Sequence, residues 1–253
     1  MDTEFTRGPA RRPAPVVEGP MLQWASGLPT ANRQIYAGWL IEAGKLDDLD
    51  GALQSAGFPQ ITIKHGSGNM VTHTAIETAN VFVLADGVQS MAEMRHTDER
   101  HGVAFGWRTL DGGRLQSMLR VQVLLRELLH VGYTDPITLT VKSTLTGDVL
   151  AALMRQYDVL DAIDAFRKLD NKPAINAPFY ACSIPIGPGM EVQRGSNGQT
   201  KEITPPIANI PAPVTKDYIA AHWIKRDWIG CIEPLIDGAI AWSETTSHQI
   251  AAG

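Results

Sequence analysis

The chain has 253 residues, of which 44% are hydrophobic and 19% are charged, and it carries a formal net charge of −5 with a pI near 5.8. This composition is typical of a globular protein that buries a core, and the acidic balance excludes a strongly cationic DNA-packaging protein. The two cysteines, Cys182 and Cys231, are too few to form a disulfide framework. Because the sequence shows neither a secretory leader nor a long uncharged apolar run, we expect a cytoplasmic protein.

The two ends of the chain differ in composition from its middle. Residues 1–20 alternate prolines and charges without an apolar face, which predicts a flexible arm. The polar segment 244–253 predicts a frayed tail. No internal repeat divides residues 21–243, which we expect to form a single α+β domain.

Helical periodicity is clear in two places. Within residues 35–57, Leu46, Leu49 and Leu53 recur at helical spacing. The strongest helix is predicted over 146–169, where apolar residues line one side. A further helical segment should begin near Thr215 and break into pieces where proline and glycine interrupt it, at Pro234 and Gly238.

Strand patterns fill the centre of the chain. Alternating residues on either side of a Gly-Ser-Gly-Asn turn predict a hairpin of 61–65 and 70–76. The segment Leu115–Leu129 fits both a strand and a helix, and we favour a long strand because a turn and an evident strand follow it. Other strands are expected at 80–84, 103–110, 137–141 and 178–186, with a second hairpin of 190–193 and 200–203.

Motifs for catalysis or cofactor binding are missing from the sequence. It contains no Walker A motif, no dinucleotide-binding fingerprint and no nucleophile elbow, so we expect no catalytic residue and no cofactor. His96 and His101 enclose Asp98 and Glu99, which leaves a metal-dependent enzyme open as an alternative function. A spacing of five places the two histidines poorly on a single helix or strand face, so a charged surface loop is the favoured interpretation.

Basic and aromatic residues gather between residues 95 and 142, where seven Lys or Arg residues outnumber five Asp or Glu residues. Aromatic side chains on a sheet can stack on bases while basic side chains neutralise phosphates, which is how single-strand binders work. The pattern predicts a non-catalytic protein that binds single-stranded nucleic acid, although the aromatic residues could instead belong to the core. The predicted binding residues are Phe105, Trp107, Arg108, Arg114, Arg120 and Lys142.

The segment 215–243 is rich in large apolar residues, among them Tyr218, Trp223 and Trp228. Such a segment either closes the core or forms an oligomer contact. A self-assembling scaffold protein is therefore a second alternative function.

The order of elements around the segment from Asp135 to Ser143 (Asp-Pro-Ile-Thr-Leu-Thr-Val-Lys-Ser) resembles that of some bacterial and mobile-element proteins. In those proteins a strand, a turn, a second strand and an apolar-faced helix form a core similar to the oligonucleotide/oligosaccharide-binding (OB) barrel of single-stranded DNA-binding proteins. The resemblance spans roughly residues 80–242, and Ser143 stands where those proteins often have glycine. It implies an OB-like barrel or a strongly curved antiparallel sheet with an interstrand helix, and nucleic-acid binding.

Overall fold

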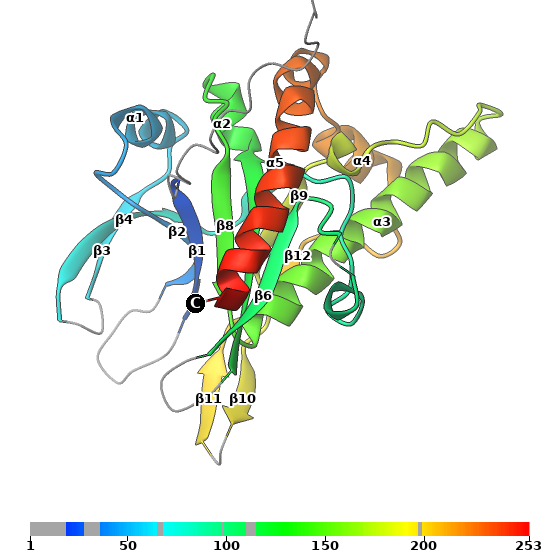
Figure 1. Cartoon of the computed structure of the whole chain (residues 1–253). Helices are drawn as coiled ribbons and strands as arrows, with labels where there is room; N and C mark the ends of the chain where they lie inside the picture. Colours follow the sequence, from blue (N-terminus) through cyan, green and yellow to red (C-terminus); the bar gives the residue numbers. More distant parts are fainter. Residues whose placement is uncertain are drawn as a thin grey trace, which may run out of the picture.

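One ten-stranded mixed sheet dominates the fold (Figure 1), in a computed structural model that describes residues 19–27, 36–64, 68–97, 99–109, 115–196 and 199–252. The fold is α+β and rich in strands, as predicted. The strands of this sheet are β1 (Met21–Ser26), β2 (Ala37–Glu42), β3 (Gln60–Lys64), β4 (Met70–Ile76), β5 (Ala79–Val83), β6 (Val103–Thr109), β7 (Leu115–Leu125), β8 (Ile137–Lys142), β9 (Ile184–Pro188) and β12 (Pro206–Ala208). A separate hairpin consists of β10 (Val192–Ser196) and β11 (Gln199–Ile203).

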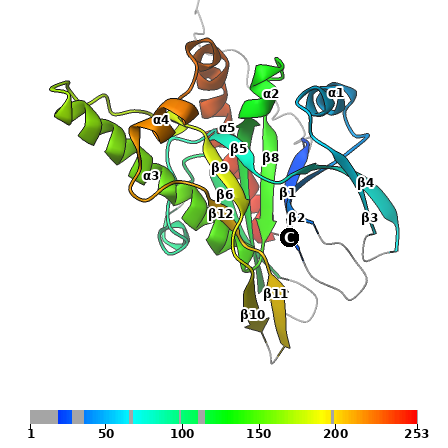
Figure 2. The same cartoon turned by 180° about the vertical axis from the view of Figure 1, so that it is seen from behind.

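The helices lie around this sheet (Figures 1 and 2). They are α1 (Asp47–Ser55), α2 (Arg126–His130), α3 (Leu145–Leu169), α4 (Lys216–His222) and α5 (Arg226–Ala252), with short 3-10 turns at Glu93–Arg95 and Phe179–Ala181. The helices predicted near Leu49 and over 146–169 are confirmed. None of the described helices combines the length and the apolar composition that crossing a bilayer requires.

The strand order is β12-β9-β5-β7-β8-β1-β2-β4-β3. Strand β7 is long enough to pair along one side with both β5 and β6, and it pairs along its other side with β8. All these pairs are antiparallel except one, because β1 runs parallel to β8 with Leu22 opposite Leu139. The sheet was expected to be antiparallel, but this one parallel pair makes it a mixed sheet.

The sheet curls strongly enough to bring β2 near β9. The indole Nε1 of Trp39 on β2 donates a hydrogen bond of 2.9 Å to the carbonyl oxygen of Ile186 on β9. Trp24 on β1 donates a similar bond of 2.9 Å to the carbonyl of Thr204. No backbone ladder joins β2 to β9 in the part of the chain that the structure describes, so the sheet stays open and the predicted OB barrel is not confirmed.

The inner face of the curl holds the main core. Side chains from β1, β2 and β5 to β9 meet there, and α1 and α3 contribute apolar residues from their buried sides. Alternation decides the composition of this face, since every second residue of a strand points the same way. Fully buried examples are Leu22, Trp39, Val81, Val121 and Leu139.

Helix α5 covers part of the outer face, diagonally in front of the sheet in Figure 1. Phe82, whose neighbours Val81 and Val83 point inward, packs outward against Trp228 at 6.0 Å between ring centroids. Near its C-terminal end the helix places Ile250 over β6 and β7, against Ala104 and Met118. Strand β5 and the adjoining parts of β6 and β7 are consequently buried on both faces, whereas Arg108 and Thr109 at the end of β6 are exposed.

Two predictions about the C-terminal region are wrong. Helix α5 continues through Pro234 and Gly238, and it runs on to Ala252 instead of fraying after residue 243. Tertiary packing explains why the helix continues to Ala252, because Ser247 and Ile250 are buried against the sheet. Pro234 lies on the exposed side of the helix, where its ring meets solvent.

Two strand predictions need correction at their ends. Strand β7 ends at Leu125, and the last residues of the ambiguous segment form helix α2. The strand expected over 178–186 begins only at Ile184, after a 3-10 turn. Both predicted hairpins are confirmed by the pairings of β3 with β4 and of β10 with β11.

Candidate nucleic-acid interface

The predicted aromatic and basic residues fall on opposite faces of the sheet. Phe105 lies on the inner face, is 3% exposed and packs in the main core opposite Leu119. Its backbone N–H donates to Oγ of Ser247, at 3.1 Å. The prediction that Phe105 stacks on a base is therefore wrong for this fold, because its ring is enclosed by other side chains.

Trp107 is on the same inner face but nearer the sheet edge, where it is half-buried. Its ring meets Phe105 edge to face, with 6.0 Å between the centroids. The guanidinium of Arg95 lies 5.1 Å from the centroid of the Trp107 ring, a cation–π contact. Trp107 thus already has partners within the protein and points away from the outer face.

The strand register brings three of the four predicted basic residues to the outer face. Arg108 is paired with Gln116, Lys142 with Met118, and Arg120 with Thr140. Residues 116, 118 and 120 of β7 share one face because side chains alternate along a strand, so their partners share it too. Arg114 lies outside the described residues.

Charge on this part of the sheet has one sign. Strands β6, β7, β8 and β1 contain no Asp or Glu, and their three charged residues are Arg108, Arg120 and Lys142. Across all ten strands of the sheet, Glu42 at the end of β2 is the one acidic residue. Arg108 and Lys142 are exposed and form no ion pair with any other described residue, whereas Arg120 is half-buried.

Polar side chains without charge surround these cations. Gln116 and Gln122 share the outer face of β7, and Gln23 is exposed on the neighbouring part of β1. Gln116 Nε2 donates to Oγ of Ser143 at 2.9 Å, which ties the β7 side chain to the end of β8. Together Arg108, Gln116, Arg120, Gln122 and Lys142 form what we call the basic sheet face.

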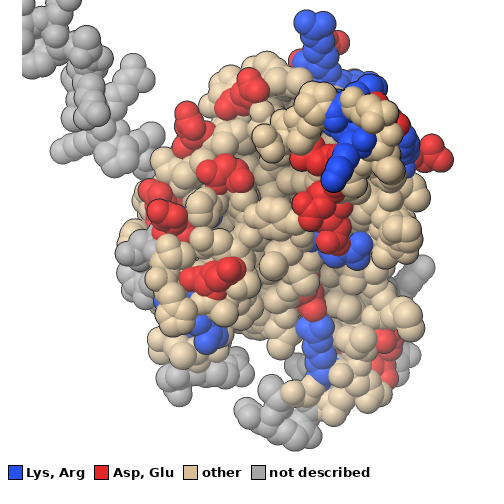
Figure 3. All heavy atoms as spheres, turned by 90° about the vertical axis from the view of Figure 1, so that its right-hand side faces the viewer, with Lys and Arg blue, Asp and Glu red and all other residues tan. Residues whose placement is uncertain are grey.

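The acidic residues in the described part of the chain lie mainly on helices and loops. Asp47, Asp48 and Asp50 occupy the first turn of α1, and α3 carries several more. Figure 3 views the side of the molecule that carries α3 and α4, and acidic side chains are scattered across it while basic ones gather mostly towards its upper edge. The basic sheet face therefore differs in charge from the helical surfaces.

Sequence reasoning missed the contribution of β1 to this face. Gln23 lies more than a hundred residues from Thr140, yet β1 pairs with β8 and sets these two residues opposite each other. Nothing in a short sequence window signals a parallel pairing between the first and the eighth strand. Strand alternation could have predicted that Gln116 belongs to this face, because it and Arg120 are an even number of positions apart on β7.

The histidine cluster does not assemble into a metal site in the described part of the chain. His101 has a left-handed backbone (φ 51°), and its Nδ1 lies 3.1 Å from Oδ1 of Asp86. Its Nε2 is 3.6 Å from Oε2 of Glu99. Among the described residues no three His, Cys, Asp or Glu side chains come together to hold an ion, and Asp98 lies outside them.

One serine–histidine contact resembles a nucleophile and its base. Ser183 Oγ lies 3.0 Å from Nδ1 of His222, whose ring stacks on Tyr218 at 4.3 Å. However, Ser183 is fully buried, and its N–H donates to the carbonyl of His222 at 2.9 Å. The contact therefore reinforces the junction of α4 with the sheet. Burial also raises the pKa of the neighbouring Cys182 thiol to about 12, so this cysteine stays protonated.

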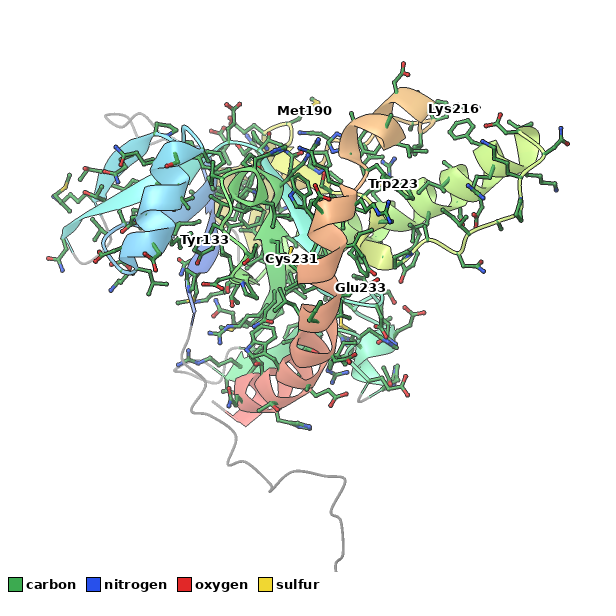
Figure 4. The ribbon with its side chains drawn as sticks, turned by 90° about the horizontal axis from the view of Figure 1, so that it is seen from above. Tyr133, Met190, Lys216, Trp223, Cys231 and Glu233 are labelled. Carbon is green, nitrogen blue, oxygen red and sulfur yellow. The ribbon has the colours of Figure 1, made fainter. Side chains whose placement is uncertain are left out.

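The aromatic residues predicted to form an oligomer contact are mostly internal. Tyr218 is 8% exposed and Trp228 is 9% exposed, since they lie on the core-facing sides of α4 and α5. Trp223 is 37% exposed, and Figure 4 shows it beside the N-terminal half of α5. The prediction is therefore corrected for Tyr218 and Trp228, which are core residues, and Trp223 is the exposed member of the three.

Chemically, the basic sheet face offers guanidinium, ammonium and amide donors with no carboxylate among them. Such a set can bind a polyanion, and it lacks the paired acid and base that general catalysis requires. No family model matches this chain, and comparisons with curated proteins and with solved structures also gave no match.

Proposed function

We propose that the protein binds single-stranded nucleic acid through the basic sheet face. The observation that carries the proposal is the clustering of Arg108, Arg120 and Lys142 on the outer side of adjacent strands that contain no acidic residue. In a chain of net charge −5, such a face is the local exception to the overall field. A local patch of this kind is the electrostatic footprint of nucleic-acid binding.

The binding energy would come mainly from phosphates. Each Lys or Arg that neutralises a phosphate releases condensed counterions, so affinity falls as salt rises. The exposed Arg108 and Lys142 carry most of this role, while Arg120 lies further along the same face. The glutamine side chains add hydrogen-bond donors and acceptors for sugars and base edges.

A single strand fits this surface better than a duplex. Duplex readers usually insert a helix with basic side chains into a groove, and the described helices carry no such row. Exposed polar and basic side chains on a sheet suit a flexible strand, which is also what the sequence resemblance to OB-type proteins implies. Base stacking on Phe105 has no part in the proposal, because that residue is in the core.

A fluorescence-anisotropy titration with a labelled oligo-dT tests the proposal. The intact protein should bind more tightly at about 50 mM than at about 200 mM salt. The double variant Arg108→Ala/Lys142→Ala should weaken binding about tenfold at low salt. It should also reduce the slope of log K against log[salt] by about 1.4, since each single-strand phosphate contact contributes about 0.7.

The matched control is Lys168→Ala/Lys172→Ala, which removes two exposed positive charges near the end of α3. This control changes the net charge by the same amount, so it should leave both affinity and salt slope close to those of the intact protein. The proposal fails if the intact protein does not bind at low salt. It also fails if the two double variants weaken binding equally.

A further inference from the structure

The three edges of the sheet are covered to different extents by other elements of the fold. The edge strand β12 is packed against α3, and the edge formed by β6 is packed against α5. The third edge is β3, and among the described elements β4 alone packs extensively against it. An uncovered edge presents unpaired backbone groups on which another strand can assemble.

The hydrogen bonds of β4 reveal which residues of β3 face outward. Ala75 N donates to the carbonyl of Pro59 at 2.9 Å, on the β3 side of β4. Ala43 N donates to the carbonyl of Thr72 at 3.0 Å, on the β2 side. Residues 71, 73 and 75 therefore direct their backbone groups towards β3, since these directions alternate along an antiparallel strand.

The register then assigns the backbone directions of β3 itself. Ile61 is opposite His73 and Ile63 is opposite Val71, so both isoleucines direct their N–H and C=O groups towards β4. Gln60, Thr62 and Lys64 direct theirs towards the free edge. This edge contains no proline or glycine, and its β-branched residues favour an extended backbone.

The sequence of this edge is complementary to itself. In an antiparallel pair of two β3 strands centred on Thr62, each Gln60 lies opposite Lys64 of the other copy, and each Ile61 lies opposite an Ile63. The two lysines lie at opposite ends, so like charges do not meet. The half-buried isoleucines would extend one apolar strip across both copies, and about six backbone hydrogen bonds would form.

We propose that the β3 edge is a self-association surface, on which a second copy of this chain adds its own β3 in antiparallel register. The pairing is isologous, as a two-fold dimer requires. Two five-residue strands bury less than the about 1,200 Å² of a standard stable complex. The dimer should accordingly be weak and dependent on concentration.

Sedimentation analysis from about 1 μM to about 1 mM tests this surface. The weight-average mass should rise from the 27.5 kDa of one chain towards twice that value. Thr62→Pro should abolish the rise, because proline removes the central outward N–H while leaving the β3–β4 ladder intact. Thr62→Val is the matched control, since it keeps the N–H and should still associate.

Amide hydrogen exchange gives a second measurement that needs no variant. Exchange at Gln60, Thr62 and Lys64 should slow as protein concentration rises, while Ile61 and Ile63 stay equally protected by β4 throughout. A constant mass over the whole range would overturn the proposal. So would a rise in mass that leaves exchange at these three amides unchanged.

Discussion

The two halves of the sheet differ in how many of their faces are covered. Strands β5, β6 and β7 lie between the main core and α5, and β5 is correspondingly apolar, with Asn80 as its one polar residue. Strand β3 carries exposed polar residues at alternate positions, and Gln23 on β1 and Lys142 on β8 are exposed as well. The comparison teaches that the placement of α5 determines which surface is left for partners. The self-association proposal concerns the open half, whereas the basic sheet face spans the boundary, with Arg108 and Arg120 on β6 and β7 and Lys142 on β8.

The largest expected effect is a core truncation in the covered half. Phe82→Ala should lower the free energy of unfolding by about 3–5 kcal/mol, because Phe82 is fully buried between the sheet and Trp228. Ile63→Ala in the open half should cost only about 1 kcal/mol, since Ile63 is half-buried. Urea denaturation measures both values, and equal costs would remove the distinction between the two halves.

The next effect concerns the close approach of α5 to β6. A Cβ atom at Gly106 would lie 2.7 Å from Cγ2 of Ile250 and 3.0 Å from its Cβ. Gly106→Ala should therefore destabilise the protein by about 1–3 kcal/mol. Ile250→Ala costs stability by itself, but it should cancel part of the added cost of Gly106→Ala, because it removes Cγ2 and keeps Cβ. A double-mutant cycle in urea measures this coupling, and simple additivity would contradict the proposed contact.

A smaller effect depends on pH. Burial raises the pKa of Glu127, whose Oε1 accepts a hydrogen bond of 2.5 Å from Nδ2 of Asn80. Because the folded pKa is raised, the protonated form favours folding, and this stability is lost as pH rises through the folded pKa. Glu127→Gln should be more stable than the intact protein at pH 8, and this advantage should shrink as the pH is lowered and Glu127 becomes protonated.

The matched control for this change is Glu42→Gln in the open half. Glu42 is exposed and forms a 3.3 Å ion pair with Lys45, a kind of contact that contributes little. Its removal should change thermal stability little at either pH. Thermal melts at pH 4 and pH 8 compare the two variants.

The smallest effect should come from the basic sheet face itself. Lys142→Ala removes an exposed side chain without an ion-pair partner among the described residues, so stability should change by less than about 0.5 kcal/mol. The same variant should weaken oligonucleotide binding if the proposed function is right. A large loss of stability instead would show that Lys142 supports the fold.

Local sequence patterns predicted most of the secondary structure. Leucine spacing found α1 and α3, and alternation found the two hairpins. What these patterns could not predict was the side on which each strand packs. Phe105 and Arg108 alternate along one strand in the sequence, but only the position of the core and α5 decides which of them reaches solvent.

Long-range packing accounts for the other errors. Pro234 and the polar residues after 243 indicate the end of a helix, yet burial of Ser247 and Ile250 against the sheet extends α5 beyond them. For the candidate interface, the sequence pattern predicted that Arg108, Arg120 and Lys142 lie on or between strands, and the register sets them on one face. The contribution of Gln23 could not be predicted, because its neighbour Thr140 is distant in the chain.

The parallel pairing of β1 with β8 also bears on how the chain folds. Strand β1 lies inside the sheet between β8 and β2, so the first described strand must wait for residues 137–142 before its second partner exists. Loop closure over such a separation carries a large entropic cost, and topologies of high contact order fold slowly. During synthesis, the β1–β2–β4–β3 ribbon should therefore stay exposed until β8 has left the ribosome. This interval is when the chain most needs protection from aggregation.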